Sequence, residues 1–127
     1  MKYNIIAVIL LSLMLTACGR RDAKIQHDLV GTWDVDLGQN FHSTTVIHSD
    51  GTFEAQVSGY TNGEIVKIEG TFRAKDGDLV DTVTKSSMTN RPVPYVLHGH
   101  LISIDDHECV MKWDGATNET HSRKVTQ

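Results

Sequence analysis

Positive charge is scarce in this sequence: 12 Lys and Arg stand against 16 Asp and Glu, which gives the 127 residues a formal net charge of −4. The chain has no basic stripe that could neutralise phosphates, so we expect no nucleic-acid partner. The same deficit argues against electrostatic docking onto an anionic membrane surface.

Catalytic motifs are also missing. The sequence contains neither a G-x-S-x-G nucleophile elbow nor an H-E-x-x-H metalloprotease motif. Asp34 and Asp36 form a same-face acidic pair, but they alternate with Trp33 and are expected to face solvent. We therefore predict a non-enzymatic protein with no catalytic residues and no cofactor.

No hydrophobic run is long enough to cross a membrane. The longest, Ile5 to Leu15, is interrupted by Ser12 and falls short of the about 20 apolar residues that a span needs. Lys2 precedes this run, and the small residues Thr16 and Ala17 follow it. A charged start, an apolar middle and small residues at the end are typical of a secretory signal peptide.

A cysteine stands at the expected cleavage site. Leu15-Thr16-Ala17-Cys18 resembles the lipobox of bacterial lipoproteins. The resemblance implies that residues 1–17 are a cleaved signal peptide and that Cys18 carries acyl chains such as palmitate. Several chains are needed because a single one anchors a protein only marginally. An ordinary signal peptide with a cysteine there by chance is the alternative.

This resemblance also predicts the location of the protein. Residues 18–28 would form an acylated N-terminus and a short tether, with a turn of helix around residues 25–29. The lipid bilayer would be a partner through Cys18, in the bacterial cell envelope. Gly19 is compatible with transfer to the outer membrane, on its periplasmic side.

Only two cysteines are present, and a thioether on Cys18 would leave Cys109 unpaired. A buried cysteine that packs as a small hydrophobe is one interpretation. An intermolecular disulfide or a reactive thiol is the other.

From Leu29 onward, apolar and polar residues alternate between glycine-containing turns. This alternation is typical of half-buried strands. Proline is confined to Pro92 and Pro94, which indicates an exposed connection or an edge at residues 86–94. The candidate strands cover residues 29–37, 42–48, 52–57, 66–74, 79–85, 95–104, 108–113 and 118–125.

Eight short strands joined mostly by tight turns predict an all-β fold. We expect an antiparallel up-and-down meander over residues 29–127 that closes into a small barrel and so removes exposed sheet edges. The interior of such a barrel is either filled by side chains or able to hold one small ligand. With three Phe, two Trp and three Tyr, the composition does not decide between these alternatives.

Four short motifs resemble the small bacterial lipocalin-like domains: Gly31-Thr32-Trp33, Asp50-Gly51-Thr52-Phe53, Gly70-Thr71-Phe72 and Gly77-Asp78-Leu79. The resemblance implies that Trp33 closes one end of the barrel. It also implies a late basic residue packed over this ring, and Arg123 is the predicted counterpart.

Inward positions of the predicted strands are candidates for ligand contact, although each of them could also belong to a solid core. They are Trp33, Val35, Phe53, Val57, Ile68, Phe72, Met111 and Trp113. The leading hypothesis is an envelope lipoprotein that binds a small apolar ligand in its barrel. An envelope protein-interaction module with a solid core, acting as an inhibitor or assembly factor, is the second.

A metal-binding protein is the third hypothesis. His98 and His100 lie two residues apart on a predicted strand and would point to the same side. Zinc or copper would suit such ligands, with His107, Asp105 and Asp106 in the following turn. The alternative is that both imidazoles simply lie on a solvated face.

Overall fold

A computed structural model describes residues 19–125 of the chain. The predicted signal peptide and Cys18 lie outside these residues.

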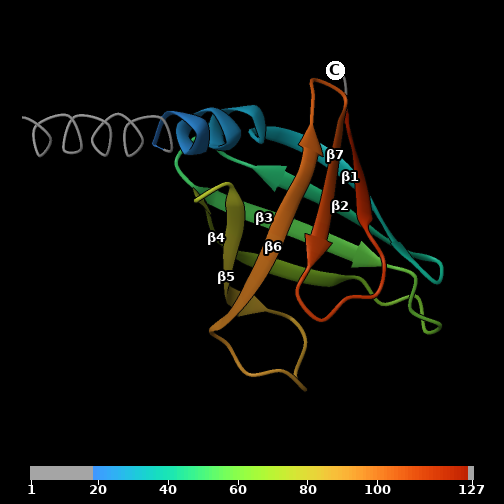
Figure 1. The fold of residues 1–127 in the computed structure, drawn as a ribbon. Coiled ribbons are helices and arrows are strands. Elements are labelled where there is room, and N and C mark those ends of the chain that lie inside the picture. The colour runs from blue at the N-terminus through green and yellow to red at the C-terminus, as the bar shows by residue number, and fades with distance from the viewer. Residues whose placement is uncertain (1–18, 126–127) are drawn as a thin grey trace, which may run out of the picture.

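Eight antiparallel strands form one closed barrel (Figure 1), which confirms the predicted fold. Each strand pairs with the next along the chain, and the last strand returns to pair with the first. The strands are β1 (Gly31–Gly38), β2 (Phe41–Ile47), β3 (Thr52–Ser58), β4 (Val66–Lys75), β5 (Asp78–Ser86), β6 (Tyr95–Ile104), β7 (Glu108–Trp113) and β8 (Thr120–Lys124).

Side-chain alternation explains why these segments become strands of a closed sheet. In β4, Val66 and Phe72 are buried while Lys67 and Glu69 are exposed. Successive residues of a strand point to opposite faces, so one face fills the barrel and the other meets water. Closure then pairs both edges of the sheet and leaves no free edge.

Gly70 is required by a bulge between β4 and β5. The register of the two strands shifts between Glu69 and Gly70. A Cβ atom at Gly70 would collide with the carbonyl oxygen of Thr82 on the neighbouring strand. Bulges bend a strand and increase its twist, which helps a small sheet to close.

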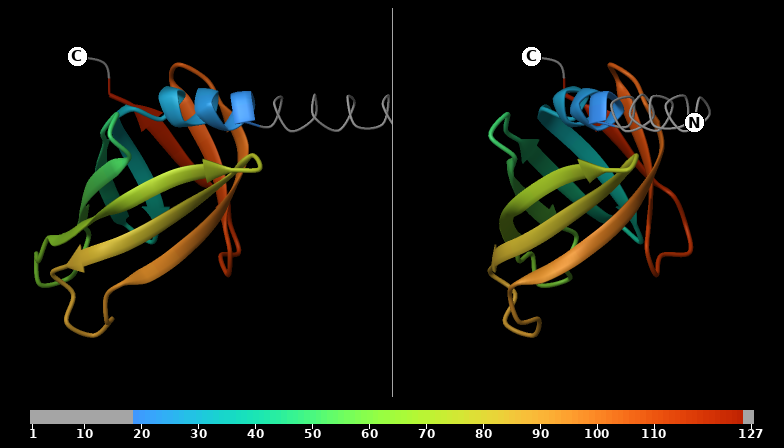
Figure 2. Two further views of the ribbon diagram at one scale, coloured as in Figure 1. Left: turned by 90° about the vertical axis from the view of Figure 1, so that its left-hand side faces the viewer. Right: turned by 60° about the vertical axis from the view of Figure 1, so that its left-hand side comes forward.

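A helix covers one end of the barrel (Figure 2). The segment predicted as a tether is helical over residues 19–28 and lies across the strand ends. Ile25 and Leu29 are buried there, with 5% and 3% of their surface exposed. The Asp22 carboxylate accepts hydrogen bonds from the backbone N–H groups of Asp76 and Gly77, both at 2.9 Å. The helix is therefore joined to the β4–β5 turn by polar contacts as well as by apolar ones.

The hydrophobic core extends from beneath this helix into the barrel. Its buried members are Ile25, Leu29, Trp33, Phe53, Phe72, Leu79, Val83, Cys109 and Met111. Within residues 19–125, no helix is both long and apolar enough to span a membrane.

Lys124, rather than Arg123, packs over Trp33, so the prediction for Arg123 is wrong. The Lys124 Nζ atom lies 5.4 Å from the centre of the Trp33 ring, a distance at which a cation–π attraction operates. Trp33 and Lys124 are opposite each other in the β1–β8 pair, so both side chains lie on the same side of the sheet. Arg123, one residue away, points outward and is exposed.

Candidate ligand cavity

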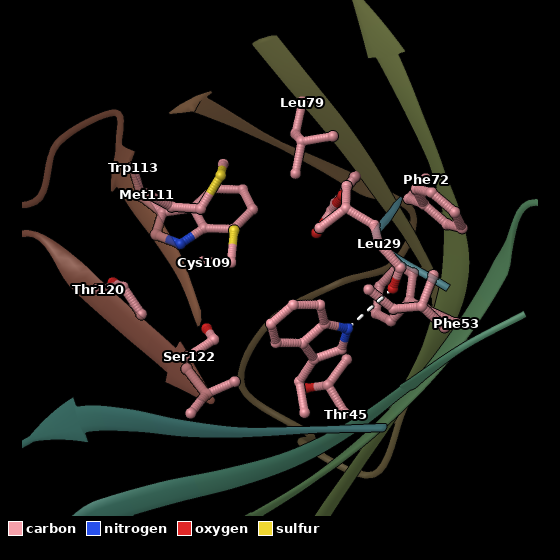
Figure 3. Close-up of a pocket in the computed structure, with 14 residues that line it drawn as sticks. Leu29, Thr45, Phe53, Phe72, Leu79, Cys109, Met111, Trp113, Thr120 and Ser122 are labelled. Carbon is pink, nitrogen blue, oxygen red and sulfur yellow. Dashed lines mark hydrogen bonds between the residues drawn. The ribbon is translucent and has the colours of Figure 1, made fainter. Parts of the chain in front are cut away.

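A cavity of about 110 Å³ lies inside the barrel and opens to solvent (Figure 3). Its wall is mainly apolar, with side chains from the end of the helix and from all the strands except β6. The lining residues are Leu29, Trp33, Val35, Thr45, Ile47, Phe53, Phe72, Leu79, Asp81, Cys109, Met111, Trp113, Thr120 and Ser122.

The helix end of the cavity is closed by Leu29 and Trp33. The indole N–H of Trp33 donates a hydrogen bond to the carbonyl oxygen of Leu29 at 2.8 Å, drawn as a dashed line in Figure 3. Only 2% of Trp33 is exposed. At the opposite strand ends, Trp113 and Thr120 are only half-buried. The cavity therefore opens away from the helix.

Gly99 on β6 makes room for the two large side chains of β7. A Cβ atom at Gly99 would lie 2.5 Å from Met111 Cε and 2.9 Å from Trp113 Cε3. Both contacts are closer than van der Waals distance, so Met111 and Trp113 cross the backbone of β6 at this glycine. Their positions on the cavity wall therefore require that residue 99 has no side chain.

Asp81 places a carboxyl group in this mainly apolar wall. It faces inward from β5, directly opposite Phe72 on β4 and Leu97 on β6. Among the described residues, no hydrogen bond or ion pair joins its side chain to another group. No motif in the sequence predicted a role for Asp81. The signal was nevertheless present, because Asp81 occupies an inward position between Leu79 and Val83.

Burial raises the pKa of the Asp81 carboxyl to about 7. The cause is desolvation, which disfavours the charged form of a carboxyl group that has no partner. Near neutral pH, this carboxyl group is therefore a mixture of the protonated and ionised forms. Strongly shifted groups in a cleft are typical of functional sites.

Three hydroxyl groups complete the polar part of the wall. They belong to Thr45 on β2 and to Thr120 and Ser122 on β8. In Figure 3, Thr120 and Ser122 lie across the cavity from Phe72 and Leu79. A small number of polar groups in an apolar pocket is the usual composition of a small-molecule site.

Six of the eight residues predicted for ligand contact line the cavity: Trp33, Val35, Phe53, Phe72, Met111 and Trp113. The other two, Val57 and Ile68, lie on β3 and β4 and are not part of its wall. Ile68 packs against the hydrophobic core instead.

Cys109 is buried and lines the cavity, with its thiol free. Burial, together with the negative charge of Glu108, raises the pKa of this thiol to about 11. A thiol is nucleophilic only as the thiolate, so Cys109 is unreactive at neutral pH. This environment fits a small apolar packing residue.

His98 and His100 lie on the exposed outer face of β6. The two ring nitrogens of His100 are 3.0 Å from an oxygen of Asp78 and 3.3 Å from an oxygen of Asp114. Hydrogen bonding and the negative charge of Asp78 raise the His100 pKa, and Asp114 adds to the effect. Nowhere in residues 19–125 do three or more His, Cys, Asp or Glu side chains form a group that could hold a metal ion.

Comparisons with protein-family models, with curated proteins and with solved structures found no match for this chain.

Proposed function

We propose that this protein binds a small apolar molecule in the cavity of its lipocalin-like barrel. The observation that carries the proposal is the open cavity of about 110 Å³ between Trp33 and Trp113. Engineered apolar cavities of about 150 Å³ enclose benzene. This cavity is smaller but open to solvent, so a short alkyl chain or a single ring that extends into the mouth is of suitable size. The cavity favours this function over an interaction module, which would need no hollow interior.

Both tryptophans of the chain line the cavity, so their fluorescence reports directly on its contents. We expect cyclohexylmethanol to change the tryptophan emission of the full-length protein in a saturable way. Ser122→Leu should abolish this response because it places a larger side chain into the cavity from β8.

Arg123→Leu is the matched control. It lies on the same strand but faces outward, and it should bind as the wild type does. Circular dichroism would verify that both variants keep their strands. Unchanged binding by a folded Ser122→Leu variant would show that the probe is bound elsewhere.

The second part of the proposal concerns the anchor: Cys18 carries the acyl chains of a lipoprotein of the bacterial envelope. The lipobox ending at Cys18 supports this, as does the apolar run before it, which is too short to span a membrane. On this proposal, the bilayer is a partner and the barrel faces the periplasm. Gly19 is compatible with transfer to the outer membrane.

Cys18→Ala should abolish the incorporation of radiolabelled palmitate in bacteria that express the full-length chain. Cys109→Ala removes the other cysteine and should leave labelling unchanged, because its thiol is buried in the barrel. Palmitate incorporation that persists in Cys18→Ala would contradict the anchor.

A further inference from the structure

Among the described residues that line the cavity, Asp81 is the only one that titrates near neutral pH. Cys109, the other titratable residue there, stays neutral at this pH. The remaining lining residues are apolar or carry a hydroxyl group. The chemistry that Asp81 recognises therefore decides which apolar molecules the cavity accepts.

The oxygens of Asp81 are accessible from the cavity. Every fully enclosed side-chain nitrogen or oxygen of the described residues has a hydrogen-bond partner. No such partner is found for Asp81 within the described chain, so its oxygens must retain contact with open space. Asp81 is half-buried, and the cavity is the open space that it lines.

Within residues 19–125, no basic side chain forms an ion pair with Asp81. Lys124, which faces inward from β8, lies over Trp33, and its Nζ atom donates to the carbonyl oxygen of Asp28 at 3.4 Å. A carboxylate in apolar surroundings is costly unless a cation or a hydrogen-bond donor reaches it. Among the described residues that line the cavity there is no cation to pair with Asp81, and a ligand can supply one.

The surroundings of the mouth carry a net negative charge, the same sign as Asp81. The loops at these strand ends contain Glu64, Asp114 and Glu119 against Arg91, whose guanidinium lies over the Tyr95 ring, and Asp36 lies near the end of β1. These acidic groups lie at the strand ends toward which the cavity opens. A negative rim attracts cations and repels anions.

We propose that the cavity selects small apolar amines, whose ammonium group pairs with the Asp81 carboxylate while the hydrocarbon part packs against Trp33, Phe72 and Met111. This inference rests on the proposed function, because it names the class of ligand that the same cavity takes. Charge-assisted hydrogen bonds between an ammonium and a carboxylate are about twice as strong as neutral ones. An apolar acid would instead place two negative charges together in the cavity.

The test uses three probes with the same ring: cyclohexylmethylamine, cyclohexylmethanol and cyclohexanecarboxylate. Each is titrated at pH 8 into the full-length protein in phosphatidylcholine nanodiscs, with tryptophan emission as the readout and empty nanodiscs as the blank. We expect the amine to bind about ten- to a hundredfold more tightly than the alcohol, and the acid to bind most weakly.

Asp81→Asn keeps the size of the side chain and removes its charge. It should lose the preference for the amine and bind the alcohol as the wild type does, which also shows that the cavity is intact. Asp34→Asn is the control, because it removes an equal charge from the exposed face of β1 and should keep the preference. An Asp81→Asn variant that still prefers the amine overturns the proposal.

A measurement on the wild type alone gives a second test. Below pH 7, Asp81 becomes protonated while the amine stays charged, so the affinity for the amine should fall between pH 8 and pH 5. The affinity for the alcohol should stay constant. If the alcohol binds and the amine shows no such fall, only the amine inference fails; if no probe binds at all, the proposed function fails with it.

Discussion

Trp33→Ala is expected to lower the free energy of unfolding by about 3–5 kcal/mol, the usual cost of truncating a fully buried Trp. Trp33 is 2% exposed and lies between the helix and the cavity. Its loss would leave the Leu29 carbonyl without the indole donor and Lys124 without the ring beneath it. Urea denaturation followed by far-ultraviolet circular dichroism would measure the change.

Trp113→Ala is the matched control for this prediction. Trp113 also lines the cavity but is half-buried at the open strand ends, so its truncation should cost clearly less. Equal losses for the two variants would mean that the covered end contributes no special stability. The helix would then be a peripheral element rather than part of the core.

Asp81→Asn is expected to stabilise the protein at pH 8 and to leave its stability nearly unchanged at pH 4. The folded protein holds the Asp81 proton up to about pH 7, while the unfolded chain releases it near pH 4. Between these values the folded state binds more protons, so the wild type loses stability as the pH rises. Asparagine has no proton to lose, and its advantage at pH 8 should be on the order of 2–4 kcal/mol.

The difference between wild type and variant isolates this contribution from those of the other carboxyl groups. Hydrogen bonds hold the pKa values of Asp50 and Asp105 below their usual range, and these groups lose their stabilisation at acidic pH in both proteins. Asp34→Asn, on the outer face, should show no comparable gain at pH 8. A constant difference between Asp81→Asn and wild type across this range would contradict the burial of Asp81.

The alternation of apolar and polar residues predicted the strands, because the side chains of successive strand residues point to opposite faces of the sheet. Residues 95–104 and 108–113 alternate or are rich in strand-forming residues up to the turns that end them, and these two strands have the predicted bounds. The packing of Lys124 on Trp33 was missed because it depends on the register between the first and last strands. That register is set by closure of the whole barrel and not by any neighbouring residue.

The candidate site was predicted in part for the same reason. Trp33, Phe72 and Met111 are large apolar residues at inward positions, so the alternation placed them inside the barrel. Whether such side chains leave a space depends on how all of them pack together, and short sequence patterns do not encode this. The carboxyl group of Asp81 interrupts the apolar face of β5 between Leu79 and Val83. Such an interruption is typical of a position where function outweighs stability.

The position of the helix determines the side from which a ligand would enter the barrel. Gly19, the residue after Cys18, already belongs to the helix that covers one end of the strands. If Cys18 is acylated, only one peptide bond separates the anchor from this helix. The end of the barrel that the helix covers would then be held beside the lipid headgroups, and the mouth of the cavity would point into the aqueous compartment. The protein would then collect water-borne molecules rather than extract them from the bilayer beneath it.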